Sequence, residues 1–171
     1  TLTEFYSEVE KAEKEHGWKF DTTVFDPFND AVDESASMGG THHWLNRELK
    51  MVRKVSKSNK RIDVLINHVA DIAPSIDKDS GRAYKRPALP DEWNGGRTWR
   101  RRGFGMILCY IPPAWLKDDN GMEYGEGVSL LYIQKAKPKG TAKYGGIARL
   151  NWDWKQNRYY WLNTNGGREV A

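Results

Sequence analysis

Disulfide bonds within the chain are excluded by its cysteine content, because Cys109 is the only cysteine in 171 residues. It lies inside an apolar run, where we expect it to pack in the core rather than to act as a nucleophile. A single thiol suits a reducing compartment. We therefore expect an intracellular protein, either cytoplasmic or associated with the nucleoid or nucleus.

Long hydrophobic runs are also missing. The longest, Met106 to Ile111, is far shorter than the roughly 20 residues that a membrane-spanning helix needs. The first residues are acidic and amphipathic, without the basic and apolar regions of a signal peptide. The sequence therefore predicts a protein with no membrane partner.

Recognised catalytic and phosphate-binding motifs are lacking as well. Gly103-Phe104-Gly105 precedes an apolar strand, whereas a phosphate-binding glycine loop follows a strand and opens a helix. No cofactor is expected, and the sequence leans towards a non-enzymatic function.

What the chain does have is the composition of one globular domain. Its residues are 39% hydrophobic and 29% charged, a mixture that can bury a core. Helical periodicity comes first and alternating strands come last, which predicts an α+β fold with N-terminal helices packed on a C-terminal, mainly antiparallel β-sheet. We expect a single domain over 1–171, with a mainly helical part at 1–74, a basic irregular loop at 75–103 and a β-rich part at 104–171.

Apolar spacing places the individual elements. A first helix is expected from Glu4 to His16, capped by Thr3, and a second from His42 to Val55, capped by Thr41. The stretch Ile62 to Ile72 fits a helix or a buried strand, and we favour the helix. Strands are expected at 104–111, 128–136, 147–154 and 158–162, the last two joined as a hairpin.

Charge is unevenly distributed along the chain. The net charge is +4, yet residues 1–34 hold three lysines against ten acidic residues, so the positive charge lies in the remainder. An acidic segment of this kind packs on the basic body or competes with a polyanion for it, and we favour packing.

The densest basic signal is Arg97-Thr98-Trp99-Arg100-Arg101-Arg102, which follows Gly95-Gly96. Guanidinium groups match phosphate geometry, and an indole ring offers a flat face on which a base can stack. Nucleic acid is therefore the first partner to consider.

Other clusters combine basic and aromatic residues in the same way. The outer face of the second helix is basic, with Lys57, Lys60 and Arg61 beyond it; Tyr144 accompanies the lysines of 135–143, and Tyr159, Tyr160 and Trp161 follow Arg158. A sheet with exposed aromatic residues flanked by basic loops suits single strands. We predict binding of single-stranded DNA or RNA through Arg47, Lys50, Arg53, Lys54, Arg82, Lys85, Arg86, Trp93, Arg97, Trp99, Arg100, Arg101, Arg102, Lys137, Lys139 and Lys143.

Two alternatives remain open. A metal-dependent or histidine-based nuclease would draw on His43, Glu48, His68 and Asp71. If 62–72 is helical, Asp63, Asn67 and Asp71 share one face and could hold Mg²⁺, with Asp63 and Asp71 the weak candidates. The second alternative is a non-enzymatic assembly or interaction protein.

Overall fold

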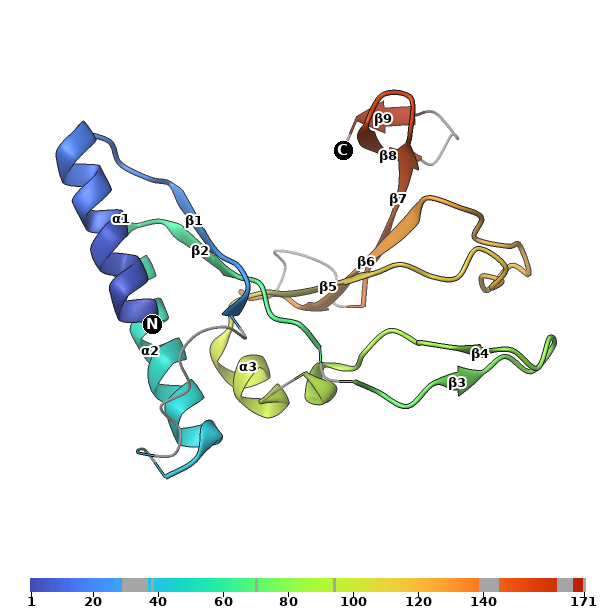
Figure 1. Ribbon diagram of the computed structural model, residues 1–171, viewed down its shortest axis with the longest axis horizontal. Helices are drawn as coiled ribbons and strands as arrows, with labels where there is room; N and C mark the ends of the chain where they lie inside the picture. Colours follow the sequence, from blue (N-terminus) through green and yellow to red (C-terminus); the bar gives the residue numbers. More distant parts are fainter. Residues whose placement is uncertain are drawn as a thin grey trace. The chain divides into compact units, whose positions relative to one another are not determined.

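The computed structural model describes residues 1–28, 37, 39–69, 71–93, 95–138, 145–162 and 168–170, the last range and Leu162 by their backbone only. The α+β class predicted from the sequence is confirmed (Figure 1). The chain forms two compact units. Unit 1 comprises Thr1–Ala70 and Pro90–Gly103, and unit 2 comprises Asp71–Leu89 and Phe104–Ala171. The described helices of more than one turn belong to unit 1, and the antiparallel sheet belongs to unit 2.

Helix α1 (Leu2–His16) confirms the first expected helix, although its cap differs. Thr1, not Thr3, is the N-cap: its hydroxyl accepts from the backbone N–H of Glu4, and the Glu4 carboxylate reaches back to Thr1. This capping box satisfies donors that the first turn would otherwise leave unpaired. Leu2 and Tyr6 point from α1 into the core.

Helix α2 (Thr41–Asn59) confirms the second expected helix and extends it by one turn. The apolar stripe of Trp44, Leu45, Leu49 and Val52 is buried, as its spacing predicts. The expected cap is wrong, because Gly40 is the N-cap and Thr41 is already helical.

Strands β1 (Thr22–Phe25) and β2 (Ile62–Leu65) pair in parallel, with α2 as the connection between them (Figure 1). The helix favoured for 62–72 is therefore wrong. Ile62, Val64 and Leu65 form a short, mostly β-branched run, and the edge of β1 provides the backbone partners that a helix would have provided locally. The result is a β–α–β arrangement at the centre of unit 1.

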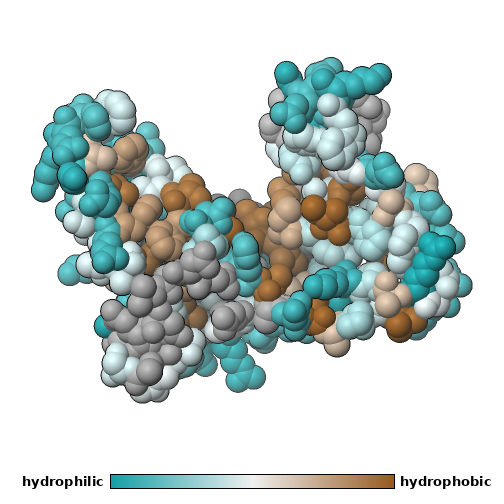
Figure 2. All heavy atoms as spheres, in the orientation of Figure 1, coloured by the Kyte–Doolittle hydropathy of each residue, from teal (hydrophilic) through white to brown (hydrophobic). Residues whose placement is uncertain are grey.

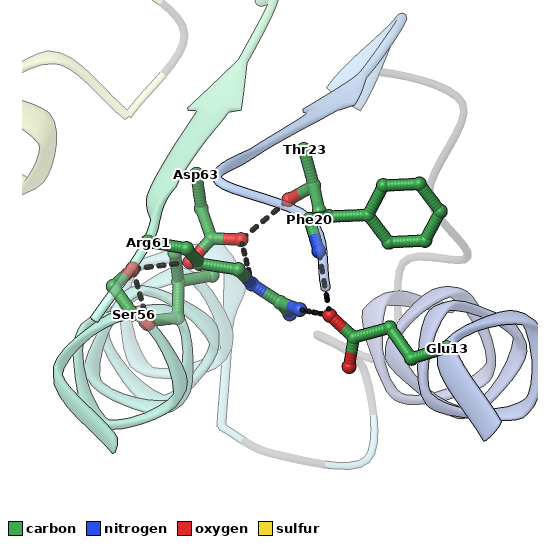
Figure 3. A network of polar contacts seen from close by, with 7 residues as sticks. Glu13, Phe20, Thr23, Ser56, Arg61 and Asp63 are labelled. Atoms are coloured by element: carbon green, nitrogen blue, oxygen red, sulfur yellow. Dashed lines mark hydrogen bonds and ion pairs between the residues drawn. The ribbon is translucent and has the colours of Figure 1, made fainter. Parts of the chain in front are cut away.

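A buried ion-pair network holds α1, α2 and the two strands together (Figure 3). The Arg61 Nε donates to Asp63 at 3.0 Å, and the Arg61 Nη1 lies 3.8 Å from the Glu13 carboxylate. The Asp63 carboxylate also accepts from the hydroxyl groups of Thr23 and Ser56. The side chains of Arg61 and Asp63 are 0% and 1% exposed. Both are structural, so Arg61 cannot serve as the surface phosphate contact expected from the sequence.

Helix α3 (Gly96–Arg102) corrects the expected irregular loop at 75–103, since seven of the last eight residues of that range are helical. Two glycines permit its close packing. A side-chain carbon on Gly95 would lie 2.3 Å from the Leu45 side chain, and one on Gly96 would lie 2.3 Å from the Asp91 carbonyl oxygen. Gly95 also has φ 79, which favours glycine. The glycine pair thus lets α3 approach α2 and the short helix η3 (Pro90–Glu92).

Unit 2 contains a five-stranded antiparallel sheet in the order β5–β6–β7–β8–β9. These strands are β5 (Met106–Tyr110), β6 (Val128–Lys135), β7 (Ile147–Asp153), β8 (Arg158–Leu162) and β9 (Arg168–Val170). Four of them confirm the strands predicted from alternation. A separate hairpin of β3 (Ser75–Ile76) and β4 (Ala83–Tyr84) lies in the segment expected to be irregular.

The two faces of the sheet differ in burial. Leu108 and Leu130 share a buried face, on which Tyr110 is half-buried and donates its hydroxyl to the Lys85 carbonyl oxygen at 2.6 Å. Burial raises the pKa of Tyr110 to about 12. The other face carries Ile107, which is 61% exposed, and Cys109, which is also exposed.

The expected burial of Cys109 is therefore wrong, because alternate residues of a strand point to opposite faces and only one face of β5 is buried. On the face of the molecule shown in Figure 2, apolar side chains are exposed among hydrophilic ones.

Candidate functional site

The first candidate site lies in unit 1, where the N-terminal half of α2 meets α3. The Thr98 hydroxyl lies 2.8 Å from Nδ1 of His42, and the Arg102 Nε donates to the Asn46 side-chain oxygen at 2.7 Å. With Arg101, these residues line a small cavity of about 90 Å³. We call this group of five residues the arginine pocket.

Helix periodicity explains why these side chains meet. His42 and Asn46 are four residues apart on α2, and Thr98, Arg101 and Arg102 are three or four apart on α3, so each set shares one helix face. The described lining presents two guanidinium groups and three hydrogen-bonding side chains, and none of these five residues is acidic. That combination matches an anion such as a phosphate group.

The other arginines of α3 differ in their surroundings. Arg97 is exposed, and Arg100 lies 3.8 Å from the Asp91 carboxylate in a pair that is itself about half exposed. Pairs of that kind contribute little to stability and exchange readily with other anions. Of the four arginines in the run, Arg101 and Arg102 are the two that the structure places in a cavity.

Basic residues continue from the arginine pocket along α2. Lys50, Arg53 and Lys57 follow Asn46 at intervals of four, seven and eleven residues, which places them on one side of the helix. From His42 to Lys57 this stripe extends about 22 Å at 1.5 Å per residue. Lys54 lies beside it, whereas Arg47 pairs with the buried Glu48 at 2.9 Å. We call Lys50, Arg53, Lys54 and Lys57 the α2 basic stripe.

Trp99 requires a correction. The sequence predicts a stacking platform within the arginine run, but Trp99 is buried, with its ring centroid 5.0 Å from that of Phe28 in an edge-to-face contact. Phe28 also lies 5.7 Å from Trp44, so these rings form the aromatic core between α2 and α3. Trp93 is half-buried, and its indole nitrogen is buried without a hydrogen-bond partner among the described residues. The Trp99 ring is therefore not presented for a base to stack on.

The remaining predicted basic residues belong to unit 2. Arg82 lies over the Trp115 ring at 5.4 Å, Lys85 pairs with Asp71 at 3.0 Å, and Arg86 donates to the Pro87 carbonyl oxygen at 3.1 Å. The expected continuous loop from Arg82 to Arg102 is thus divided between the two units. Lys137 is exposed after β6, while Lys139 and Lys143 lie outside the described residues.

A second candidate site lies on the β7–β8 hairpin of unit 2. Trp154 is 76% exposed, Trp161 43% and Tyr159 38%. Trp152 contacts both Trp154 and Tyr159, with ring centroids 5.8 Å and 4.8 Å away. These exposed rings are where bases could stack. The sequence prediction included Tyr159 and Trp161 but missed Trp154. The position of Trp154 at the start of the expected hairpin turn is the feature that could have identified it.

The candidate catalytic and metal-binding residues are not brought together. Glu48 is buried and pairs with Arg47, and His43 is exposed at the start of α2. Because 62–65 is a strand, the expected helical stripe of Asp63 and Asp71 does not form. Asp63 is held by Arg61, while Asp71 is exposed in unit 2 beside Lys85, and His68 is exposed in unit 1.

Over the part of the chain that the structure describes, no cluster of three or more His, Cys, Asp or Glu side chains has a metal-binding arrangement. The helices in this part are also too short or too polar to cross a membrane. A comparison of the chain with models of known protein families finds no match.

Proposed function

We propose that the protein binds single-stranded nucleic acid. The arginine pocket and the α2 basic stripe hold phosphate groups, and the aromatic residues of the β7–β8 hairpin stack on bases. The observation that carries the proposal is the arginine pocket itself, in which Arg101 and Arg102 line a cavity with three hydrogen-bonding side chains, none of the five described lining residues being acidic.

Charge and geometry support the phosphate contacts. A guanidinium group forms two parallel hydrogen bonds with a phosphate, and the Arg102 Nε bond to Asn46 fixes the orientation of one such group. Lys50 and Lys54 of the α2 basic stripe are exposed and extend the positive surface away from the pocket. Together the arginine pocket and the α2 basic stripe extend about 22 Å along α2, which suits several successive phosphates of one strand.

Exposed rings support single strands over duplexes. Indole and phenol rings can stack only on bases that are not already paired and stacked in a helix. Trp154, Tyr159 and Trp161 are exposed in unit 2, where they would serve this role. Stacking of this kind tolerates any base sequence, so the phosphate contacts set most of the affinity.

The direct test is fluorescence anisotropy with a labelled single-stranded oligonucleotide at low salt. We expect binding that Lys50→Ala/Arg101→Ala weakens by tenfold or more, since each lost phosphate contact removes a charge-assisted hydrogen bond. The matched control is Lys14→Ala/Lys19→Ala, which removes the same charge from exposed positions of unit 1 outside α2 and α3.

Two results would overturn the proposal. One is no affinity of the wild-type protein for DNA or RNA at low salt. The other is an equal loss for both double variants, which would assign the binding to net charge alone. A defined oligomer in light scattering, together with no nucleic-acid binding, would favour an assembly protein.

A further inference from the structure

A cavity of about 550 Å³ lies at the turn of the β7–β8 hairpin in unit 2. Trp152, Trp154 and Tyr160 provide its aromatic lining, and the polar lining consists of Asn151, Asp153, Glu126 and Lys155. We call it the hairpin pocket. Its volume and its mixture of flat rings with a few polar side chains are typical of a site for a small ring compound.

The turn fixes the position of the aromatic rings. The Asp153 carboxylate accepts from the backbone N–H groups of Lys155 and Gln156 at 2.9 Å and 3.2 Å, which orders the residues that follow Trp154. The Tyr160 hydroxyl donates to the side chain of Gln156 across the same turn. Trp154 is therefore a highly exposed ring on an ordered turn, so little conformational entropy is lost when a flat ligand stacks on it.

The polar groups of the hairpin pocket determine which ligand atoms fit. Glu126 is exposed at its rim, and a carboxylate can only accept hydrogen bonds at neutral pH. Asn151 adds an amide nitrogen that is buried without a partner among the described residues. The lining holds two carboxylates against the one ammonium group of Lys155, a balance that disfavours a phosphate group here, in contrast to the arginine pocket. The ligand that fits is an uncharged ring that donates a hydrogen bond to a carboxylate and accepts one from an amide nitrogen such as that of Asn151.

We infer that the hairpin pocket takes one nucleobase of the bound strand, and that it selects bases with an exocyclic amino group, such as cytosine, over thymine and uracil. The amino group donates to Glu126, as carboxylates accept from the cytosine amino group in DNA recognition. In thymine and uracil the one ring N–H lies between two carbonyl oxygens, which a carboxylate repels. This inference rests on the proposed function and adds a base preference to it.

The test compares oligo(dC) with oligo(dT) of the same length by anisotropy at fixed salt and slightly alkaline pH. We expect the wild-type protein to bind oligo(dC) roughly tenfold more tightly, the range of one good base contact. Glu126→Gln should remove most of this preference, and Trp154→Ala should weaken both complexes roughly tenfold through lost stacking.

Two matched control variants separate the effect of the hairpin pocket from general effects of removing a charge or an indole ring. Glu123→Gln changes the same charge at an exposed position that does not line the cavity, and Trp18→Ala removes an indole that is 60% exposed in unit 1. Both controls should retain the wild-type affinities and preference. If the wild-type protein binds both oligonucleotides equally, or if Glu126→Gln and Trp154→Ala match their controls, the inference is overturned while the proposed function stands.

Failure of the proposed function is distinguished by a second measurement that uses no strand. Cytidine, uridine and glucose at millimolar concentration are titrated into the protein, and the indole N–H signals are followed by NMR. Shifts with cytidine that exceed those with uridine and disappear in Glu126→Gln support the base pocket even if no oligonucleotide binds. No shift with cytidine, or shifts with glucose alone, would overturn it.

Discussion

The α2–α3 pair of unit 1 and the β7–β8 hairpin of unit 2 place their tryptophans in opposite ways. In unit 1, Trp44 and Trp99 are buried against Phe28, whereas Lys50, Lys54 and Arg101 are exposed. In unit 2, Trp154 and Trp161 are exposed. An arginine of the same unit, Arg149, is half-buried, donating to the Tyr124 carbonyl oxygen at 2.9 Å. The arginine pocket and the exposed rings of the β7–β8 hairpin thus belong to different units.

Adjacency in the sequence concealed this division. Arg97 and Arg101 are each two residues from Trp99, and at about 100° per residue they lie on the opposite side of α3. Burial of the indole in the core of unit 1 therefore fixes the outward direction of these two guanidinium groups. Trp99 therefore supports the arginine pocket by packing in the core of unit 1, and it is not a ligand contact.

The largest effect is expected from the buried ion pair of unit 1. Asp63→Ala leaves the Arg61 guanidinium buried without its main partner, which should lower the free energy of unfolding by about 3–5 kcal/mol in a urea titration. Arg61→Met/Asp63→Leu removes both charges and should recover most of the loss. Asp71→Ala, which breaks an exposed pair in unit 2, should cost less than about 1 kcal/mol. Equal losses for the two single variants would contradict this contrast.

The tryptophans provide the next test of the comparison. Trp99→Ala should destabilise unit 1 by about 3 kcal/mol, the lower end for a buried tryptophan because the short helix α3 can shift to fill the space. Trp154→Ala should change stability by less than about 0.5 kcal/mol, since the ring is mostly exposed. Thermal unfolding measures both. A larger loss for Trp154→Ala would show that the roles of the two rings are reversed.

The glycine pair predicts a smaller effect. Gly96→Ala places a carbon atom against the Asp91 backbone and should cost about 2 kcal/mol, displacing α3 and weakening the arginine pocket as well. Gly105→Ala in unit 2 is the control, because its nearest neighbour would be 3.7 Å away. If urea titrations show equal stability for both variants, α3 does not depend on this close approach.

The smallest effect is expected at alkaline pH. The pKa of Tyr110 is raised to about 12 by burial, above its ordinary value of 10.0. Its contribution is therefore complete below pH 10 and is lost as the pH rises towards 12, by at most about 1 kcal/mol for a half-exposed group. Tyr110→Phe should show less stability loss over that range, followed by circular dichroism against pH. If Tyr110→Phe and the wild-type protein lose stability equally between pH 10 and 12, the contribution assigned to Tyr110 is contradicted.

The sequence predicted long, regular elements well and short ones poorly. α1 and α2 have enough turns for apolar periodicity to define a face, and β6 to β8 alternate between clear turn signals. β2 has four residues, too few for periodicity to decide, and its strand form depends on pairing with β1, which is about 40 residues earlier. α3 is preceded by two glycines, which normally indicate a loop, and its stability comes from packing on α2.

The arginine pocket could be predicted only in part, again because local sequence patterns do not reveal contacts between distant segments. Arg101, Arg102 and the α2 basic stripe could be recognised from charge alone. Their partners His42, Asn46 and Thr98 could not, because the contact joins residues 56 positions apart. The hairpin pocket depends on the order of the strands, which composition does not reveal.

The most direct test of the account is the salt dependence of single-strand binding. The logarithm of the binding constant should fall linearly with the logarithm of salt concentration between about 50 and 200 mM. Arg101→Ala should make the slope shallower by about 0.7, the contribution of one phosphate contact, while Trp154→Ala should leave it unchanged. An unchanged slope in Arg101→Ala, or no binding at the lowest salt, would contradict the assignment of phosphate contacts to unit 1.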